Sequence, residues 1–180
     1  MIFYRPRIWL YFALALVLTT SCLQQKSSLV LDEDAPDQSM KNATIQYTDS
    51  GRLQMITWGA EILFFDDEEE TQEFTQGVEA TFYGEKGKVN SIITADEATN
   101  WQKKKLMHLR KNVVINDLKG GARTYTEEFF WDQDAGRLYS KVHVLRITKD
   151  GSRWQGSGFE SDENMDDFRL IRPRLDIVVR

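Results

Sequence analysis

Apart from carboxylates, few residues of this 180-residue sequence belong to the types that carry out catalysis or bind metals. There is one cysteine, and the two histidines, His108 and His143, stand outside any metal-binding pattern such as H-E-x-x-H. The sequence contains no G-x-S-x-G nucleophile motif and no glycine-rich phosphate loop. We therefore expect no metal, no cofactor and no enzymatic activity.

Carboxylates are the one group of catalytic type that is abundant. Glu127 and Glu128 are adjacent, but neighbouring residues on a strand point to opposite faces, whereas a glycoside hydrolase needs two carboxylates facing each other across a cleft. The acidic runs 66–70 and 162–167 lack the glycine and terminal glutamate of a calcium loop, so we expect solvated loops there. A secreted glycan hydrolase stays open as the less favoured alternative.

The single cysteine, Cys22, follows a segment typical of protein export. Arg5 and Arg7 precede an apolar run from Ile8 to Leu18, which is too short for a hydrocarbon core that takes about 20 residues to span. Small polar residues then lead to Cys22, in a pattern that resembles a bacterial lipobox, although Thr19 stands where that box usually has an aliphatic residue. We predict lipid attachment at Cys22; the alternatives are an ordinary signal or a retained anchor helix.

The whole chain divides into four segments by composition. We expect an export signal or anchor over residues 1–22, a polar, acidic tether over 23–43, a folded domain over 44–172 and a basic tail over 173–180. The basic residues precede the apolar run, so the domain lies outside the cytoplasm. With a net charge of −5, the chain is a poor partner for nucleic acid.

From Thr44 onward the pattern predicts an all-β domain made of repeated hairpins. Short β-rich runs are separated by turns with a glycine at 51, 87, 121 and 151, where the positive φ of a hairpin turn favours that residue. In most of these units a threonine and then acids follow the glycine, for example Thr57 with Glu61, and Thr94 with Asp96 and Glu97. Such similarity at an interval of 30–36 residues indicates hairpins stacked along an axis.

Alternate apolar positions on the predicted strands are the candidates for a ligand-lining interior. A shift of one residue in register would turn any of them outward. They are Val78, Ala80, Phe82, Met107, Leu109, Val113, Ile115, Val142 and Val144.

The segment from Ile45 to Leu170 resembles the LptC family of periplasmic lipopolysaccharide-export proteins. The stretches that carry the resemblance are YTDSGRLQMITWGAE, VEATFYGEKGKVNSIITADEATNWQKKKLMHLRKNVVI, TEEFFWDQDAGRLYSKVHVLRIT and GSRWQGSGFESDENMDDFRL. No single motif is diagnostic, and the ordered series of hairpins is the signal. Two features depart from the family: the lipoprotein-like signal in place of a full transmembrane helix, and the basic tail.

The resemblance implies a single, V-shaped, open antiparallel β-jellyroll that carries the lipid part of lipopolysaccharide between its sheets. It also implies a site at the periplasmic face of the inner membrane of a Gram-negative envelope. The N-terminal strand edge would receive an ATP-driven permease complex, and the C-terminal edge would pass lipid to an LptA-like bridge protein. A soluble bridge protein of the same fold is the second possibility. A structural lipoprotein without ligand is the third, and a completely filled interior would favour it.

Overall fold

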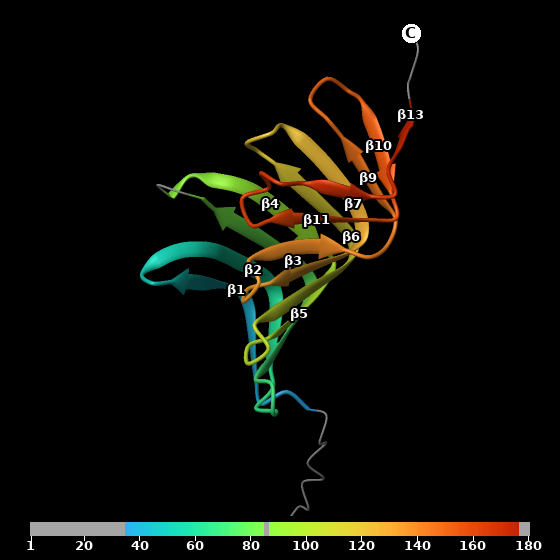
Figure 1. Cartoon of the computed structure of the whole chain (residues 1–180). Coiled ribbons are helices and arrows are strands. Elements are labelled where there is room, and N and C mark those ends of the chain that lie inside the picture. Colours follow the sequence, from blue (N-terminus) through green and yellow to red (C-terminus); the bar gives the residue numbers. More distant parts are fainter. Residues whose placement is uncertain (1–34, 85–86, 177–180) are drawn as a thin grey trace, which may run out of the picture. The chain divides into compact units, whose positions relative to one another are not determined.

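The computed structural model describes residues 35–84 and 87–176, which form one β unit (Figure 1). Within these residues there are thirteen strands, every strand pairing is antiparallel and no segment is helical, which confirms the expected all-β class. The strands are β1 (Gln38–Asp49), β2 (Arg52–Phe64), β3 (Thr71–Tyr83), β4 (Val89–Ala95), β5 (Glu97–Trp101), β6 (Leu106–Asp117), β7 (Ala122–Asp132), β8 (Arg137–Ser140), β9 (Val144–Ile147), β10 (Arg153–Gly156), β11 (Gly158–Asp162), β12 (Arg169–Ile171) and β13 (Arg174–Asp176).

The long strands change partners halfway along, and this divides the sheet into two layers. The first half of β3 pairs with β5 and its second half with β4, while the first half of β6 pairs with β5 and its second half with β4. We call layer A the sheet that contains β4, β9, β10 and β13, and layer B the sheet that contains β5, β8, β11 and β12. β1, β2, β3, β6 and β7 run through both layers, which are therefore joined along one line, the crease.

Bulges and left-handed residues produce the bend at the crease. The register of β2 with β3 shifts between Gly59 and Glu61, and that of β6 with β7 shifts between Arg110 and Val113. Asn112 has a φ of 51°, in the left-handed region, and its Nδ2 donates to Asp96 Oδ2 at 2.7 Å. An extra residue with positive φ bends a strand sharply, so the polar residues here turn each long strand from one layer into the other.

The hairpin turns lie where the sequence places them. Gly51, Gly87, Gly121 and Gly151 all have φ between 70° and 87°, and each closes a turn of layer A. A Cβ at Gly51, Gly87 or Gly151 would meet nothing within 4 Å, so the backbone conformation, not lack of space, selects glycine. The repeated hairpins predicted from these glycines are therefore confirmed.

Two boundaries differ from the sequence-based division. β1 begins at Gln38, inside the segment expected as a tether, because the second half of β2 continues past the crease and pairs with residues 38–41. The basic tail contains strand β13, which pairs with Arg153–Gln155 of β10. In both places backbone hydrogen bonds form a strand whose polar side chains give no signal of one. The signal and Cys22 lie outside the described residues, and residues 35–84 and 87–176 hold no helix that could span a membrane.

A buried ion pair fixes the free end of layer A. Arg146 Nη2 donates to Asp117 Oδ2 at 2.8 Å, and these side chains are only 12% and 3% exposed. Arg146 also donates to Thr124 Oγ1 at 3.0 Å, while the other Asp117 oxygen accepts the Gly120 backbone N–H at 2.6 Å. The pair therefore connects β9 to β7 and to the β6–β7 turn.

We expect Asp117→Ala to lower the free energy of unfolding by about 3–5 kcal/mol, because it leaves the Arg146 guanidinium buried without its counter-charge. Urea unfolding of the purified protein measures this. Asp134→Ala is the matched control: it removes an exposed partner of Lys105 and should change the free energy of unfolding far less. Equal effects of the two substitutions would contradict a structural role for the buried pair.

Candidate functional site

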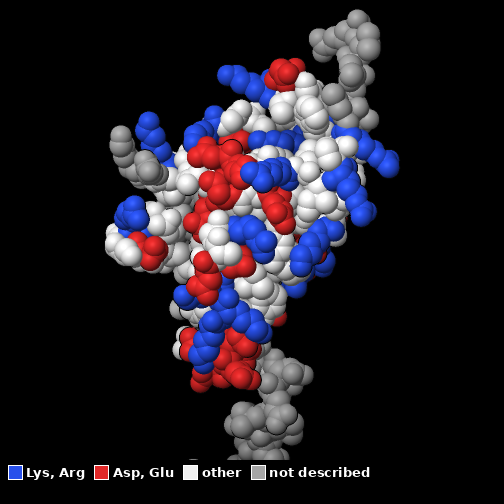
Figure 2. Space-filling model, in the orientation of Figure 1, with Lys and Arg blue, Asp and Glu red and all other residues white. Residues whose placement is uncertain are grey.

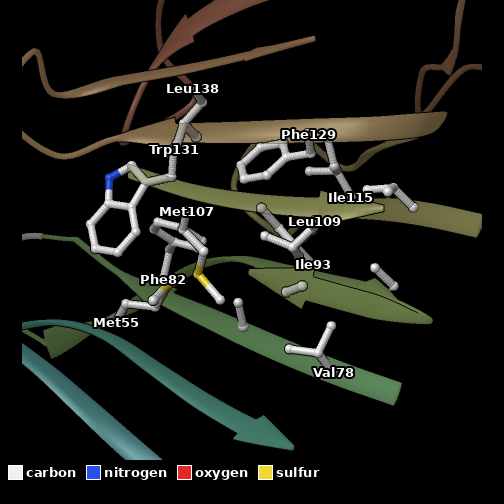
Figure 3. Close-up of a cluster of buried hydrophobic side chains, with 14 of the residues drawn as sticks. Met55, Val78, Phe82, Ile93, Met107, Leu109, Ile115, Phe129, Trp131 and Leu138 are labelled. Atoms are coloured by element: carbon white, nitrogen blue, oxygen red, sulfur yellow. The ribbon is translucent and has the colours of Figure 1, made fainter. Parts of the chain in front are cut away.

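The inner faces of the two layers form one apolar interior, and it contains eight of the nine candidate positions. Val78, Ala80, Phe82, Met107, Leu109, Val113, Ile115 and Val144 are each at most 3% exposed and belong to one hydrophobic cluster. Figure 3 shows several of these side chains converging from neighbouring strands. The cause is strand register: Ala80 lies opposite Ile93, which lies opposite Ile115, so that their side chains share a face.

Val142 is the exception. It lies in the break between β8 and β9 at the crease, where it is half-buried and lines a hollow on the outside of the sheet. Alternation counted back from Val144 fails there because the chain leaves extended pairing at residues 141–143. Val142 is therefore not one of the buried interior positions.

Further side chains, beyond the nine candidates, fill the interior and pack against the candidates. Phe82 of layer A meets Trp131 of layer B edge to face, with ring centroids 5.2 Å apart. The same alternation identifies these further interior residues, which are Met55, Ile62, Phe74, Ile93, Ala95, Ala98, Phe129, Trp131, Leu138 and Phe159. The layers thus pack directly against each other, and the interior is filled by the protein's own side chains.

A polar cluster crosses the interior near β1. Tyr47 of layer A donates from its hydroxyl to Gln72 Oε1 of layer B at 3.1 Å, and Asn100 Nδ2 donates to the Tyr47 oxygen at 3.1 Å. Burial raises the pKa of Tyr47 well above its usual range, so the hydroxyl stays protonated and remains a donor. Asn100 Oδ1 is buried with no partner among the described residues. The inner surface is therefore mainly apolar, with this polar cluster near β1 and a second buried contact between the hydroxyls of Thr126 and Ser140 at 3.1 Å.

At the other end, the loop between β11 and β12, two strands of layer B, reaches across to layer A. We call residues 163–168 of this loop the strap. Trp131 Nε1 donates to Glu163 Oε1 at 2.6 Å, Asn90 Nδ2 donates to Asn164 Oδ1 at 2.9 Å, and Lys119 pairs with Asp166. Asn90 lies near the start of β4 and Lys119 in the β6–β7 turn, both at the free end of layer A, so the strap bridges the free ends of the two layers, on the side away from the crease.

Apolar side chains of the strap close the interior from that side. Met165 is 6% exposed and joins the core, and the ring of Phe168 stacks on Phe159 with centroids 5.0 Å apart. The Arg146 guanidinium covers the outer side of Phe168, 4.0 Å from the ring centroid. Asp162 Oδ1 accepts the backbone N–H of Asp166 at 2.7 Å and so shapes the turn. This acidic run is a structural bridge instead of the expected solvated loop.

On the outer face of layer B, aromatic side chains stack across four strands. His108 lies 3.9 Å from Phe130, and Phe130 lies 4.9 Å from Tyr139, both measured between ring centroids in near-parallel rings. Trp101 stacks on the other side of His108, so this tryptophan lies outside the interior. Burial, and next the Arg110 guanidinium, lower the pKa of His108, and Glu128 opposes them.

The lowered pKa of His108 predicts loss of stability in mild acid. The unfolded chain binds a proton near pH 6.5 that the folded chain takes up only at lower pH. The stability contributed by the neutral ring is therefore complete above pH 6.5 and is lost as the pH falls through the folded pKa. Melting temperatures between pH 8 and pH 5 should fall more steeply for the natural chain than for His108→Phe. His143→Asn, which alters the exposed histidine, should retain the natural slope; identical slopes in all three would refute this role.

The site offers little for hydrolysis. Asp117 is the one buried charged side chain among the described residues, and it is engaged by Arg146. Within residues 35–84 and 87–176, no three metal-ligating side chains gather in one place. Two carboxylates facing each other across a cleft, as a glycan hydrolase requires, are not found in the described interior.

Comparison with known families gives the context of this interior. A family model described as "Lipopolysaccharide-assembly, LptC-related" matches residues 8–173. The chain belongs to this LptC-related family. A role in lipopolysaccharide transport follows for the chain, and the resemblance seen in the hairpin series is confirmed.

A solved structure of similar fold supports the same architecture. It is LptH of Pseudomonas aeruginosa, described as the LptA-homologous periplasmic component of the lipopolysaccharide transport device. The TM-score is 0.51 at 13% sequence identity, and the match covers 83% of this LptC-related chain and 98% of LptH. At that identity the likeness concerns the jellyroll fold alone. No curated protein matches the chain.

Proposed function

We propose that this LptC-related protein binds the acyl chains of lipopolysaccharide between layers A and B and acts as a membrane-tethered periplasmic transfer module. The observation that carries the proposal is the continuous apolar interior between two layers that share a backbone connection at the crease. Acyl chains cannot cross water bare, at about 0.8 kcal/mol per exposed CH₂, and such an interior shields them. The energy for transport comes from a separate, ATP-driven permease.

Because the interior is filled, lipid entry requires the layers to part, and the strap is where they do so. The crease is continuous backbone, whereas the contacts that the structure shows between the strap and layer A are made by side chains. An acyl chain that displaces Met165 and Phe168 exchanges one apolar contact for another, so the main cost of opening is the loss of the polar strap contacts. The filled interior by itself fits a structural protein with no ligand, and membership of the LptC-related family is what favours a binding module.

The two ends of the sheet provide the proposed contacts with partners. Among the described residues β1 pairs only with β2, and its other edge, twelve residues long, is the proposed docking surface for the jellyroll of an inner-membrane permease complex. At the far end, β12 and β13 form the edges proposed to pass lipid to an LptA-like bridge protein.

Lipidated Cys22, or a retained helix, would tether the chain to the periplasmic face of the inner membrane. A cleaved, unlipidated N-terminus, visible by mass spectrometry, would instead favour the soluble bridge.

Photo-crosslinking tests the interior path. Benzoylphenylalanine at Phe82, which faces inward, should label with purified lipopolysaccharide on irradiation. The matched control is Thr81, the preceding residue on β3, which belongs to the opposite face of the strand. We expect at least about tenfold more labelling at Phe82 than at Thr81, because the sheet separates the side chain of Thr81 from lipid bound in the interior. Equal labelling at the two positions, or none at either, would rule out an interior path.

A further inference from the structure

The outside of the crease carries a hollow that the interior lipid path does not use. It measures about 440 Å³ and lies where β8 leads into β9, β10 into β11 and β12 into β13. Its lining includes Lys141, His143, Gln155, Ser157, Arg172 and Arg174. A hollow of this size falls within the range of small-ligand sites in proteins.

The charge of this hollow is opposite to that of the chain. Four of its lining residues are basic types and none is acidic, although the chain as a whole has a net charge of −5. Lys141, Arg172 and Arg174 form no ion pair with a carboxylate that the structure describes. In Figure 2, Lys and Arg side chains also predominate along the side of the molecule that carries β13. By contrast, Lys103 and Lys104, on a turn of layer B, each contact a glutamate.

The backbone conformation around the hollow determines its shape and the positions of its arginines. Arg172 has a φ of 49°, in the left-handed region, where a non-glycine residue is strained. A Cβ at Gly156 would lie 2.9 Å from the Ile171 carbonyl oxygen, so no side chain fits at this part of the lining. His143 Nε2 lies 3.0 Å from Gln155 Oε1, which connects two segments of the wall. The basic groups are therefore grouped by the fold around a space without side chains.

We propose that this hollow binds a phosphoryl group. A phosphate monoester carries a charge of about −1.5 to −2 at pH 7 and three acceptor oxygens, and the planar fork of arginine suits that geometry. Arg172 and Arg174 are the main ligands, and Lys141 supplies a further positive charge. The Nζ atom of Lys141 lies 5.3 Å from the centroid of the Tyr139 ring, and this contact keeps the ammonium group near the crease. The site lies outside the interior and is independent of acyl-chain binding.

The test uses the full chain in nanodiscs of phosphatidylcholine, titrated with inorganic diphosphate and followed by amide NMR. We expect saturable shifts at Gly156, Ser157 and Arg172, and at least about tenfold weaker binding in Arg172→Gln/Arg174→Gln, since both guanidinium contacts are lost. The matched control, Arg52→Gln/Arg123→Gln, removes the same charge from exposed arginines elsewhere and should change the affinity less than about twofold.

Nanodiscs that contain phosphatidic acid distinguish the source of the phosphoryl group. Shifts of the same amides without added diphosphate, again lost in Arg172→Gln/Arg174→Gln, would assign the site to a lipid headgroup. Shifts with diphosphate alone would assign it to a soluble phosphate compound. Unsaturable shifts spread over all basic surfaces, or equal weakening in the control variant, would overturn the proposal. Melting temperatures of both variants verify that each is folded.

Discussion

A disulfide between the strap and layer A is expected to abolish loading of lipopolysaccharide. Asn90 Nδ2 lies 2.9 Å from Asn164 Oδ1, so side chains at these two positions reach each other across the gap and make them the pair to replace by cysteines. The bridge would add a covalent link between the free ends of layers that are otherwise continuous only at the crease. An interior closed on both sides has no route for an acyl chain, and the loss should exceed that from any single side-chain contact.

Loading is measured as photo-crosslinking of lipopolysaccharide to benzoylphenylalanine at Phe82. Oxidised Asn90→Cys/Asn164→Cys should give less than about a tenth of the natural signal, and reduction should restore it, because only the covalent link differs between the two states. Lys105→Cys/Asp134→Cys is the control, since it joins two turns of layer B and leaves the strap free. Mass spectrometry verifies each bridge and the state of Cys22. Full loading of the oxidised strap variant would refute opening at the strap, while failure of the natural chain to load would refute the interior path itself.

Local signals accounted for most of the fold. The positive φ that a hairpin turn demands selects glycine, so Gly51, Gly87, Gly121 and Gly151 revealed the turns without any knowledge of the tertiary structure. Burial on one face of a strand imposes alternation, which placed eight of the nine candidates in the buried interior, while their contact with a ligand stays a prediction. The acids that recur after most of these glycines lie at the crease: Asp96 accepts from Asn112 there, and Glu61 accepts from Gln76.

The features that decide how the interior opens depend on contacts between residues distant in the sequence. Asn90 meets Asn164 across 74 positions, and Trp131 meets Glu163 across 32, so nothing near either residue indicates the partner. The acidic composition of 162–167 resembles that of a solvated loop, and only the fold turns it into a bridge. Val142 shows the same limit on a smaller scale, because alternation holds only while a strand remains paired.

Loosening the strap is expected to have the opposite effect to locking it. Asn164→Ala/Asp166→Ala removes the partners of Asn90 Nδ2 and of the Lys119 ammonium, which are the polar contacts of the strap with layer A, and leaves the apolar residues of the strap in place. A neutral hydrogen bond contributes about 0.5–1.5 kcal/mol and an exposed ion pair about 0–1 kcal/mol. Since about 1.4 kcal/mol is a factor of ten in an equilibrium, the open population, and with it the initial rate of loading, should rise on the order of tenfold.

The sign of this change separates a gate from a merely stabilising loop. A substitution that only destabilises the fold lowers both the melting temperature and the yield of loaded protein, whereas release of a closure lowers the melting temperature and raises the loading rate. Asp134→Ala, which removes an exposed ion pair between two turns of layer B, should leave the loading rate unchanged. A double variant that loads no faster than the natural chain would show that the layers part elsewhere. Slower loading after the lock and faster loading after the release would together place the moving element at the strap, because no other connection is altered by both.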